Sequence, residues 1–117
     1  MALSLRAKQS IFARLLARLL DQATLRGYDV TLGEAWRSKE EAARLAAAGK
    51  GIKNSLHCLR LAIDLNLFKE GKYLTTPKHY RALGVWWEGQ STVDVVCAWG
   101  GRFGDANHFS VAHGGRK

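Results

Sequence analysis

The chain has 117 residues, enough for one compact domain over residues 1–117 but too few for two independent hydrophobic cores. A composition of 47% hydrophobic and 24% charged residues is typical of a globular protein and excludes a disordered chain. Lys and Arg total 18 against 10 Asp and Glu, and the net charge of +8 favours an anionic partner: nucleic acid, an anionic membrane or an anionic envelope polymer.

The first predicted element is a helix from about Ser4 to Leu25. Its apolar residues recur at three- and four-residue steps, and Gly27 ends the pattern. Arg14, Arg18 and further charges interrupt the apolar stretch, which is therefore too short and too charged for a signal peptide or a membrane span. We expect synthesis in the cytoplasm, with no signal peptide and no membrane insertion.

A strand is predicted over residues 28–32, followed by a second helix. Ser38 and Glu41 have the spacing of a capping box, so the helix begins at Ser38, and it ends at Gly49. A Gly- and Lys-rich loop covers residues 49–54. Residues 62–68 form the clearest strand, because Ile63, Leu65 and Leu67 alternate with residues that point to the other face.

The C-terminal half predicts shorter elements. A turn at Glu70-Gly71 leads to a returning strand near Tyr73, and Thr76-Pro77 begins a helix that ends near Glu88. An apolar run at 93–96 and a glycine-rich segment precede a final strand at 107–111. Helices come first and strands later, so we expect an α+β fold in which a small antiparallel sheet packs against about three helices.

The chain has two cysteines, Cys58 and Cys97, which allow one disulfide at most. In a cytoplasmic chain we expect two free thiols, both largely buried.

Asp64 lies in the middle of the apolar strand, on the face that it shares with the small residue Ala62. A carboxylate is costly to bury unless it has a cation, a polar partner or water. His57 stands seven residues earlier, where one turn of a loop could bring its imidazole beside Asp64. A single pair of this kind usually makes only a hydrogen bond, so the pair alone does not define a metal site.

Asp105-Ala106-Asn107-His108 supplies a second carboxylate and a second histidine. Catalytic zinc takes three protein ligands and keeps one open position for water, a requirement that His57, Asp64 and His108 satisfy. Asp105 would then act as the general base that takes a proton from the attacking water. We expect one zinc ion per chain, at a site on the sheet. Arg37 either forms a surface ion pair or reaches into a cleft, where it would bind a substrate carboxylate or the oxyanion.

These residues resemble the motifs of a known family. Ser55-Leu56-His57 and Ala62-Ile63-Asp64 resemble the SxHxxGxAxD signature of the D-alanyl-D-alanine carboxypeptidases, a family of zinc metallopeptidases that includes vancomycin-resistance dipeptidases and phage L-alanyl-D-glutamate endolysins. Residues 105–108 are similar to its second motif, and Glu34-Ala35-Trp36-Arg37-Ser38 is similar to its arginine-serine motif. Trp99-Gly100-Gly101 looks like the endolysin branch. The resemblance covers about residues 28–112.

The resemblance implies that His57, Asp64 and His108 bind zinc and that Asp105 is the catalytic base. It makes Arg37 a contact of the substrate or transition state and Ser55 a supporting residue of the cleft. Arg60 stands where the signature has glycine, so the loop between His57 and Asp64 differs if that glycine serves a special backbone angle.

The function that we expect is an endolysin-like peptidase of a phage or prophage that hydrolyses the stem peptides of peptidoglycan, at the L-Ala–D-Glu bond. It would be a monomer with one peptidase domain and no separate wall-binding domain, which suits a Gram-negative host. It would be made in the host cytoplasm and reach the periplasm or cell wall through a holin-type lesion.

Other functions stay open. A D-Ala–D-Ala carboxypeptidase would share the metal ligands, and a catalytically inactive metal-binding domain would share the fold, although an intact Asp105 argues against it. From another class, a basic nucleic-acid-binding protein or metal nuclease would explain the charge of +8. The basic residues form no arginine-rich run and no known nucleic-acid motif is present, so we expect no nucleic-acid partner.

Overall fold

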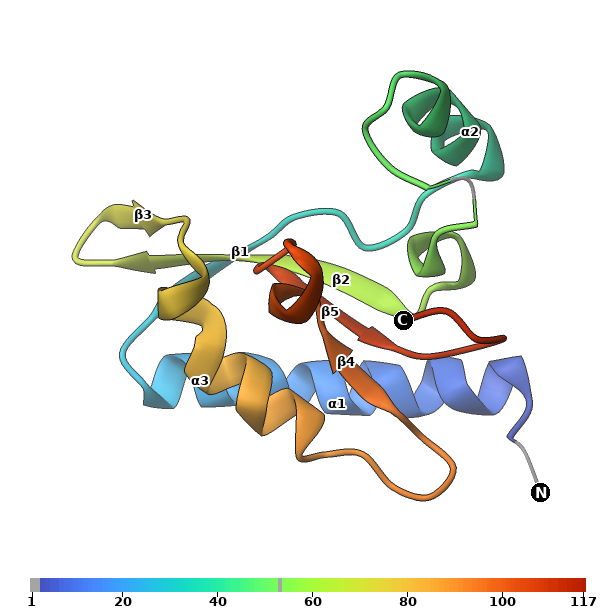
Figure 1. Ribbon diagram of the computed structural model, residues 1–117. Coiled ribbons are helices and arrows are strands. Elements are labelled where there is room, and N and C mark those ends of the chain that lie inside the picture. Colours follow the sequence, from blue (N-terminus) through green and yellow to red (C-terminus); the bar gives the residue numbers. More distant parts are fainter. Residues whose placement is uncertain (1–2, 53) are drawn as a thin grey trace.

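The computed structural model describes residues 3–52 and 54–117. Within these ranges the protein has three α-helices and a five-stranded antiparallel sheet, so the predicted α+β fold is confirmed. Figure 1 shows α1 and α3 on one side of the sheet and α2 on the other. No helix in the described ranges is both long and apolar enough to cross a membrane.

Helix α1 (Leu5–Leu25) is the longest element and forms the base of the core. The Ser4 hydroxyl caps its N-terminus by accepting a hydrogen bond from the Ala7 amide, at 3.2 Å. Its apolar stripe is buried at every third or fourth position, as the sequence predicts. Gly27, which follows the last turn, has a φ of +86° that L side chains rarely adopt, and it lets the chain reverse toward the sheet.

The sheet consists of β1 (Asp29–Leu32), β2 (Ala62–Lys69), β3 (Lys72–Leu74), β4 (Cys97–Trp99) and β5 (His108–Val111). The strand order is β1-β2-β5-β4, and β3 also pairs with β2. The predicted strands near 28–32, 62–68, 73 and 107–111 are all present. Strand β4 was not predicted, because three residues are too few to show a strand pattern, and it is held by its register with β5.

Strand β2 separates the core from the open face of the sheet. Ile63, Leu65 and Leu67 are buried among the helices, while Asp64 and Asn66 on the other face are only partly buried. Helix α3 (Pro77–Glu88) closes the core with Tyr80, Leu83 and Trp87, and it begins at Thr76-Pro77 as predicted. This arrangement leaves the second face of the sheet free for polar side chains.

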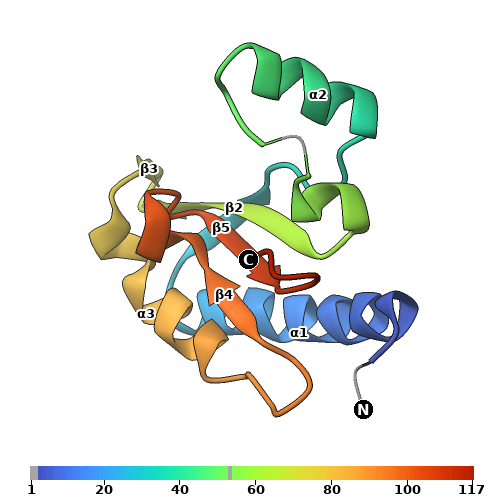
Figure 2. The ribbon, with the colours of Figure 1, turned by 45° about the vertical axis from the view of Figure 1, so that its right-hand side comes forward.

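Helix α2 (Lys39–Ala47) projects away from the helical layer, as Figure 1 and Figure 2 show. The Ser38 hydroxyl accepts from the Glu41 amide at 3.0 Å, which is one half of the predicted capping box. The Glu41 carboxylate pairs with Arg44 instead of returning to the Ser38 backbone. The predicted 49–54 loop follows, although Lys53 lies outside the described residues.

Both cysteines are free thiols, as expected. Cys97 is buried, and burial raises the pKa of its thiol to about 11. Cys58 is only partly buried.

Candidate metal centre on the open face of the sheet

Asp64 and His108 come from adjacent strands. They are direct partners in the antiparallel register of β2 and β5, so their side chains emerge side by side on the open face. His108 Nδ1 lies 3.5 Å from Asp64 Oδ1. The period-2 alternation that buries Ile63 and Phe109 is therefore what places a carboxylate next to an imidazole here.

His57 reaches the same place from η1 (Leu56–Leu59), a short 3-10 helix that was not predicted. The buried Ser55 begins this turn, and its hydroxyl accepts from the His57 amide at 3.1 Å. His57 Nε2 lies 3.4 Å from Asp64 Oδ1. On the other side of the ring, Nδ1 lies 3.2 Å from the Ala35 carbonyl oxygen. A carbonyl can only accept, so we assign a proton to Nδ1, and Nε2 faces Asp64, where it can bind either a second proton or a metal ion.

These three side chains form a group that could hold a metal ion. One ligand atom from each of His57, Asp64 and His108 lies within 4.8 Å of the others. Both histidines are buried, and Asp64 Oδ1 is buried with no hydrogen-bond partner among the described residues. A buried carboxylate oxygen is costly without a partner, and a cation between the three groups would remove that cost. Two imidazoles and a carboxylate are also a common donor set for zinc.

The charges around Asp64 favour its ionised form. Burial alone would raise the pKa of this carboxyl group, but the neighbouring nitrogens of His108 and His57 outweigh burial and lower it to about 2. Burial would likewise lower the pKa of His57, but the carboxylate of Asp64 outweighs burial and raises it. The Asp64 carboxylate is thus ionised at neutral pH, and an ionised carboxylate attracts a cation.

Asp105 lies at the mouth of the cluster. Its side chain is 55% exposed, and Oδ2 lies 3.8 Å from His108 Nδ1. A tight turn fixes this position, since the Asp105 amide donates to Gly100 O at 2.8 Å and the His108 amide donates to Asp105 O at 3.1 Å. A Cβ at residue 100 would overlap with that Asp105 oxygen, so the turn requires glycine there.

The cluster opens into a cavity of about 290 Å³. Arg37 lines it and is held by Glu34, which accepts from Arg37 Nε at 2.6 Å and also pairs with its Nη2. Arg37 therefore reaches into a cleft, which is the second of the two predicted alternatives, and its ion pair is not the surface pair of the first, because its side chain is only 13% exposed. The lining residues are Arg37, Lys50, Gly51, Ile52, Ser55, Leu56, His57, Asp64, Phe103, Asp105, His108 and Lys117.

The structure thus brings all six predicted site residues to one cavity. The sequence analysis gave no role in the site to Glu34, which holds Arg37, or to Lys50, Phe103 and Lys117, which line the cavity. Glu34 stands in the motif at residues 34–38, but this segment is not helical, so no spacing rule predicts its ion pair with Arg37. No sequence pattern points to Lys50 or Lys117, because only the fold brings the loop after α2 and the C-terminal segment to the cluster.

The chain matches no protein-family model and no curated protein sequence.

The loop before β2 has two notable residues, Arg60 and Cys58. Arg60 has a φ of 57° and a ψ of 36°, so the left-handed angle that glycine adopts most readily is present although the residue is arginine. Its guanidinium lies 5.1 Å from the centre of the Trp36 ring. Cys58 lies in the 3-10 turn η1, and it lines a different pocket from the cluster.

Proposed function

We propose that the protein is a zinc-dependent peptidase, of the phage or prophage endolysin kind, that hydrolyses stem peptides of bacterial peptidoglycan. The observation that carries this proposal is the convergence of His57, Asp64 and His108 in one cavity with Asp105 at its mouth. Two buried imidazoles and an ionised carboxylate suit zinc, which has one position open for water when three protein groups bind it. Zinc bound here would polarise a peptide carbonyl and lower the pKa of a water molecule to about 7.

Asp105 has the position of a proton acceptor. Its carboxylate is exposed to the cavity and lies beside His108, so it is accessible to a water molecule that approaches the cluster. A peptidase of this type needs one group that takes a proton from the attacking water and returns it to the leaving amine. Asp105 would do both without leaving its place in the turn.

The rest of the cavity favours an acidic peptide. Arg37, Lys50 and Lys117 line it, whereas the lining acids are Asp64 of the cluster and Asp105 at its mouth. Stem peptides of peptidoglycan carry free carboxylates, which these three cations would bind. Arg37 is pre-oriented by Glu34, so it would hold a substrate carboxylate or the developing oxyanion at little entropic cost.

The endolysin-like segment Trp99-Gly100-Gly101 favours the L-Ala–D-Glu bond as the scissile bond. A D-Ala–D-Ala carboxypeptidase remains the second candidate, because the motifs around His57, Asp64 and His108 are common to both activities. In the endolysin role the protein would cross the inner membrane through a holin-type lesion and act in the periplasm or cell wall. Neither candidate requires a nucleic-acid partner.

The metal content tests the first half of this proposal. After dialysis against zinc and removal of the excess, we expect about one zinc per chain in the wild type and in His79→Ala, a histidine on α3 outside the cavity. His57→Ala and His108→Ala should each lose the metal. An absence of bound zinc in the wild type, or an equal loss in His79→Ala, would contradict the proposal.

A further inference from the structure

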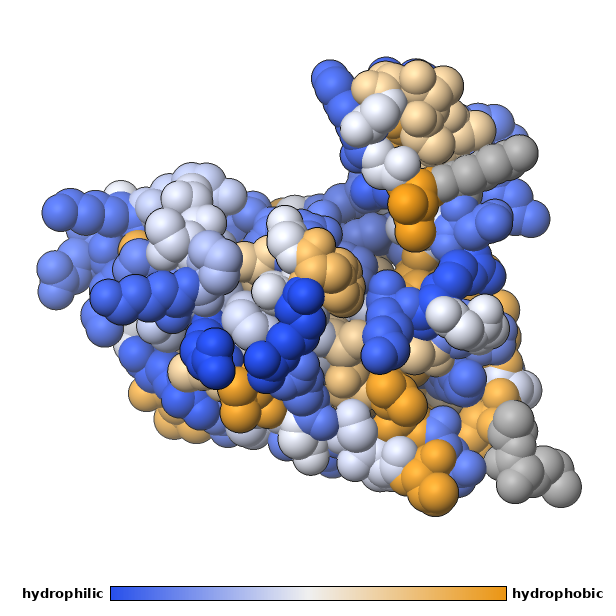
Figure 3. Space-filling view, in the orientation of Figure 1, coloured by the Kyte–Doolittle hydropathy of each residue, from blue (hydrophilic) through white to orange (hydrophobic). Residues whose placement is uncertain are grey.

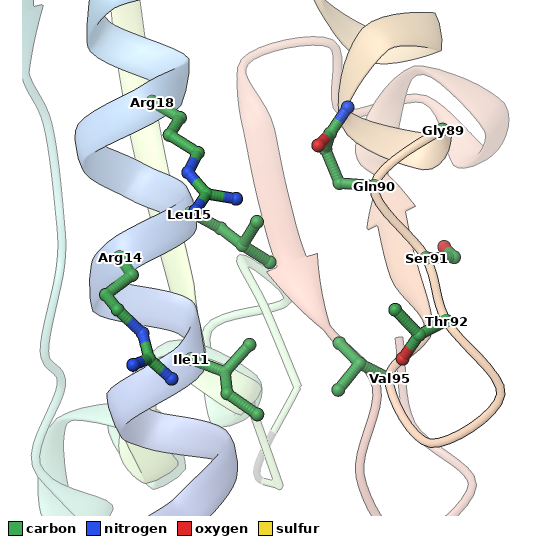
Figure 4. A pocket seen from close by; sticks show the side chains of 9 residues that line it. All are labelled: Ile11, Arg14, Leu15, Arg18, Gly89, Gln90, Ser91, Thr92 and Val95. Atoms are coloured by element: carbon green, nitrogen blue, oxygen red, sulfur yellow. The ribbon is translucent and has the colours of Figure 1, made fainter.

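A second, larger cavity of about 500 Å³ lies in the helical layer, on the side of the sheet away from the metal cluster. It is a groove between α1 and the segment that joins α3 to β4. Figure 4 shows its lining: Ile11, Arg14, Leu15 and Arg18 on α1, and Gly89, Gln90, Ser91, Thr92 and Val95 opposite.

Arg14 and Arg18 form the charged wall of this groove. They are one helical turn apart, both are exposed, and Figure 4 shows both side chains extending from α1 along the opening. None of the ion pairs or side-chain hydrogen bonds among the described residues includes either arginine, and no acidic residue lines the groove. Two like charges at this spacing repel each other, so an anion between them would be stabilising.

On the opposite wall, the carbonyl groups at the end of α3 already have hydrogen-bond partners. The last four carbonyl groups of that helix, at residues 85–88, all accept hydrogen bonds from residues 89–91. The Ser91 hydroxyl accepts from the Cys97 amide. The two guanidinium groups therefore remain available to a ligand.

Apolar side chains line part of the groove and lie exposed beside it. Leu15 on α1 and Val95 on the opposite wall are buried, and Val93 is 97% exposed on the segment that forms that wall. Val96 is also exposed. Figure 3 shows apolar surface at the lower edge of the molecule, where the segment between α3 and β4 projects in Figure 1. Two neighbouring arginines can bind a phosphate group, and the exposed valines of the nearby loop can contact hydrocarbon. A phospholipid offers both groups side by side.

We propose that this groove binds the phosphate headgroup of an anionic phospholipid and docks the helical face of the protein on an anionic membrane surface. Arg14 and Arg18 bind the phosphate, and Val93 and Val96 contact the region where headgroups meet acyl chains. A soluble phosphate compound would use the arginines but would leave the exposed valines without a role. The metal cluster lies on the opposite face of the sheet, so docking leaves its cavity open to solvent. This inference does not depend on the proposed peptidase activity.

Vesicle binding tests the proposal. The protein would be sedimented with vesicles of phosphatidylcholine alone or with phosphatidylglycerol added. We expect binding to the anionic vesicles only, and a loss of about tenfold or more in Arg14→Gln/Arg18→Gln. The matched control Lys72→Gln/Lys78→Gln also removes two exposed positive charges, but from residues outside the groove, and it should bind nearly as well as the wild type.

Two further variants separate a lipid surface from general charge attraction. Val93→Ser should weaken vesicle binding at unchanged charge, and Asp94→Asn should strengthen it, because Asp94 is the acidic residue of the 91–96 segment. Equal losses in the two double variants would overturn the proposal, as would unchanged binding in Arg14→Gln/Arg18→Gln. Full competition by millimolar glycerol phosphate, with no effect of Val93→Ser, would assign the groove to a soluble phosphate compound and also overturn it.

Discussion

Asp64 Oδ1 lies 3.5 Å from Nδ1 of His108, its cross-strand partner, and has no hydrogen-bond partner among the described residues. The backbone pairing of β2 and β5 thus fixes two of the three candidate ligands before any metal binds. The third, His57, is oriented by the Ala35 carbonyl. Because the three candidate ligands are already held in place, the site should bind zinc without a large change of fold.

Zinc should therefore stabilise the protein. At a free zinc concentration 100 times the dissociation constant, the gain is about 2.7 kcal/mol, or a rise in Tm of roughly 10 °C for a domain of this size. Differential scanning fluorimetry with and without zinc would measure it. His108→Ala should lose this shift, and His79→Ala should keep it. A wild-type Tm that zinc leaves unchanged would contradict a preformed site.

Zinc affinity should fall as the pH is lowered. The raised pKa of His57 means that its ring keeps a proton to a higher pH than a free imidazole does, and that proton competes with the metal. Asp64, with a pKa of about 2, is already ionised and adds no competition near neutral pH. We expect a loss of about tenfold in apparent affinity per pH unit below the His57 pKa for this one proton. Competition with a chromophoric chelator between pH 5.5 and 8 would show it; a flat profile would exclude His57 as a ligand.

The face of the sheet that carries the site was predictable, whereas the supports of the site were not. Alternation along β2 locates Asp64 correctly, because burying Ile63 and Leu65 forces Asp64 to the other face. The cap at Ser38 and the start of α3 follow from local backbone chemistry and were also predicted. The contact between His57 and Ala35 joins residues 22 positions apart, and no local pattern encodes it. The same is true of β4, which exists only through its pairing with β5.

Arg60→Gly should stabilise the protein slightly. A left-handed backbone costs a non-glycine residue about 1–2 kcal/mol, but glycine loses more entropy on folding, and the contact with Trp36 would be lost. We expect a net gain of about 0.5 kcal/mol in the free energy of unfolding, measured by urea denaturation. Glu70→Gly, at the other non-glycine position with positive φ among the described residues, makes no such aromatic contact and should gain more. A loss of stability at Arg60→Gly would mean that the stacked guanidinium outweighs the backbone strain.

Gly100→Ala should damage the candidate site from a position outside it. The added Cβ would overlap with the Asp105 carbonyl oxygen and would lie 2.7 Å from His108 Cβ. We expect a loss of about 1–3 kcal/mol in the free energy of unfolding, together with weaker zinc binding. Gly89→Ala is the matched control, since residue 89 has a helical φ of −67° and its nearest neighbour would be a carbonyl oxygen at 3.3 Å. If Gly100→Ala bound zinc as the wild type does, the 100–108 turn would have no part in placing His108.

The most direct test of the central proposal is mass spectrometry of purified peptidoglycan after digestion with the zinc-loaded protein. We expect soluble stem peptides that begin with D-Glu, and glycan chains that keep only L-Ala. Asp105→Asn should retain its zinc but release these fragments about 10²–10⁴ times more slowly, because it lacks the proton acceptor. Release of terminal D-Ala alone would instead identify a D,D-carboxypeptidase. Intact peptidoglycan after incubation with protein that carries one zinc per chain would contradict the proposed peptidase.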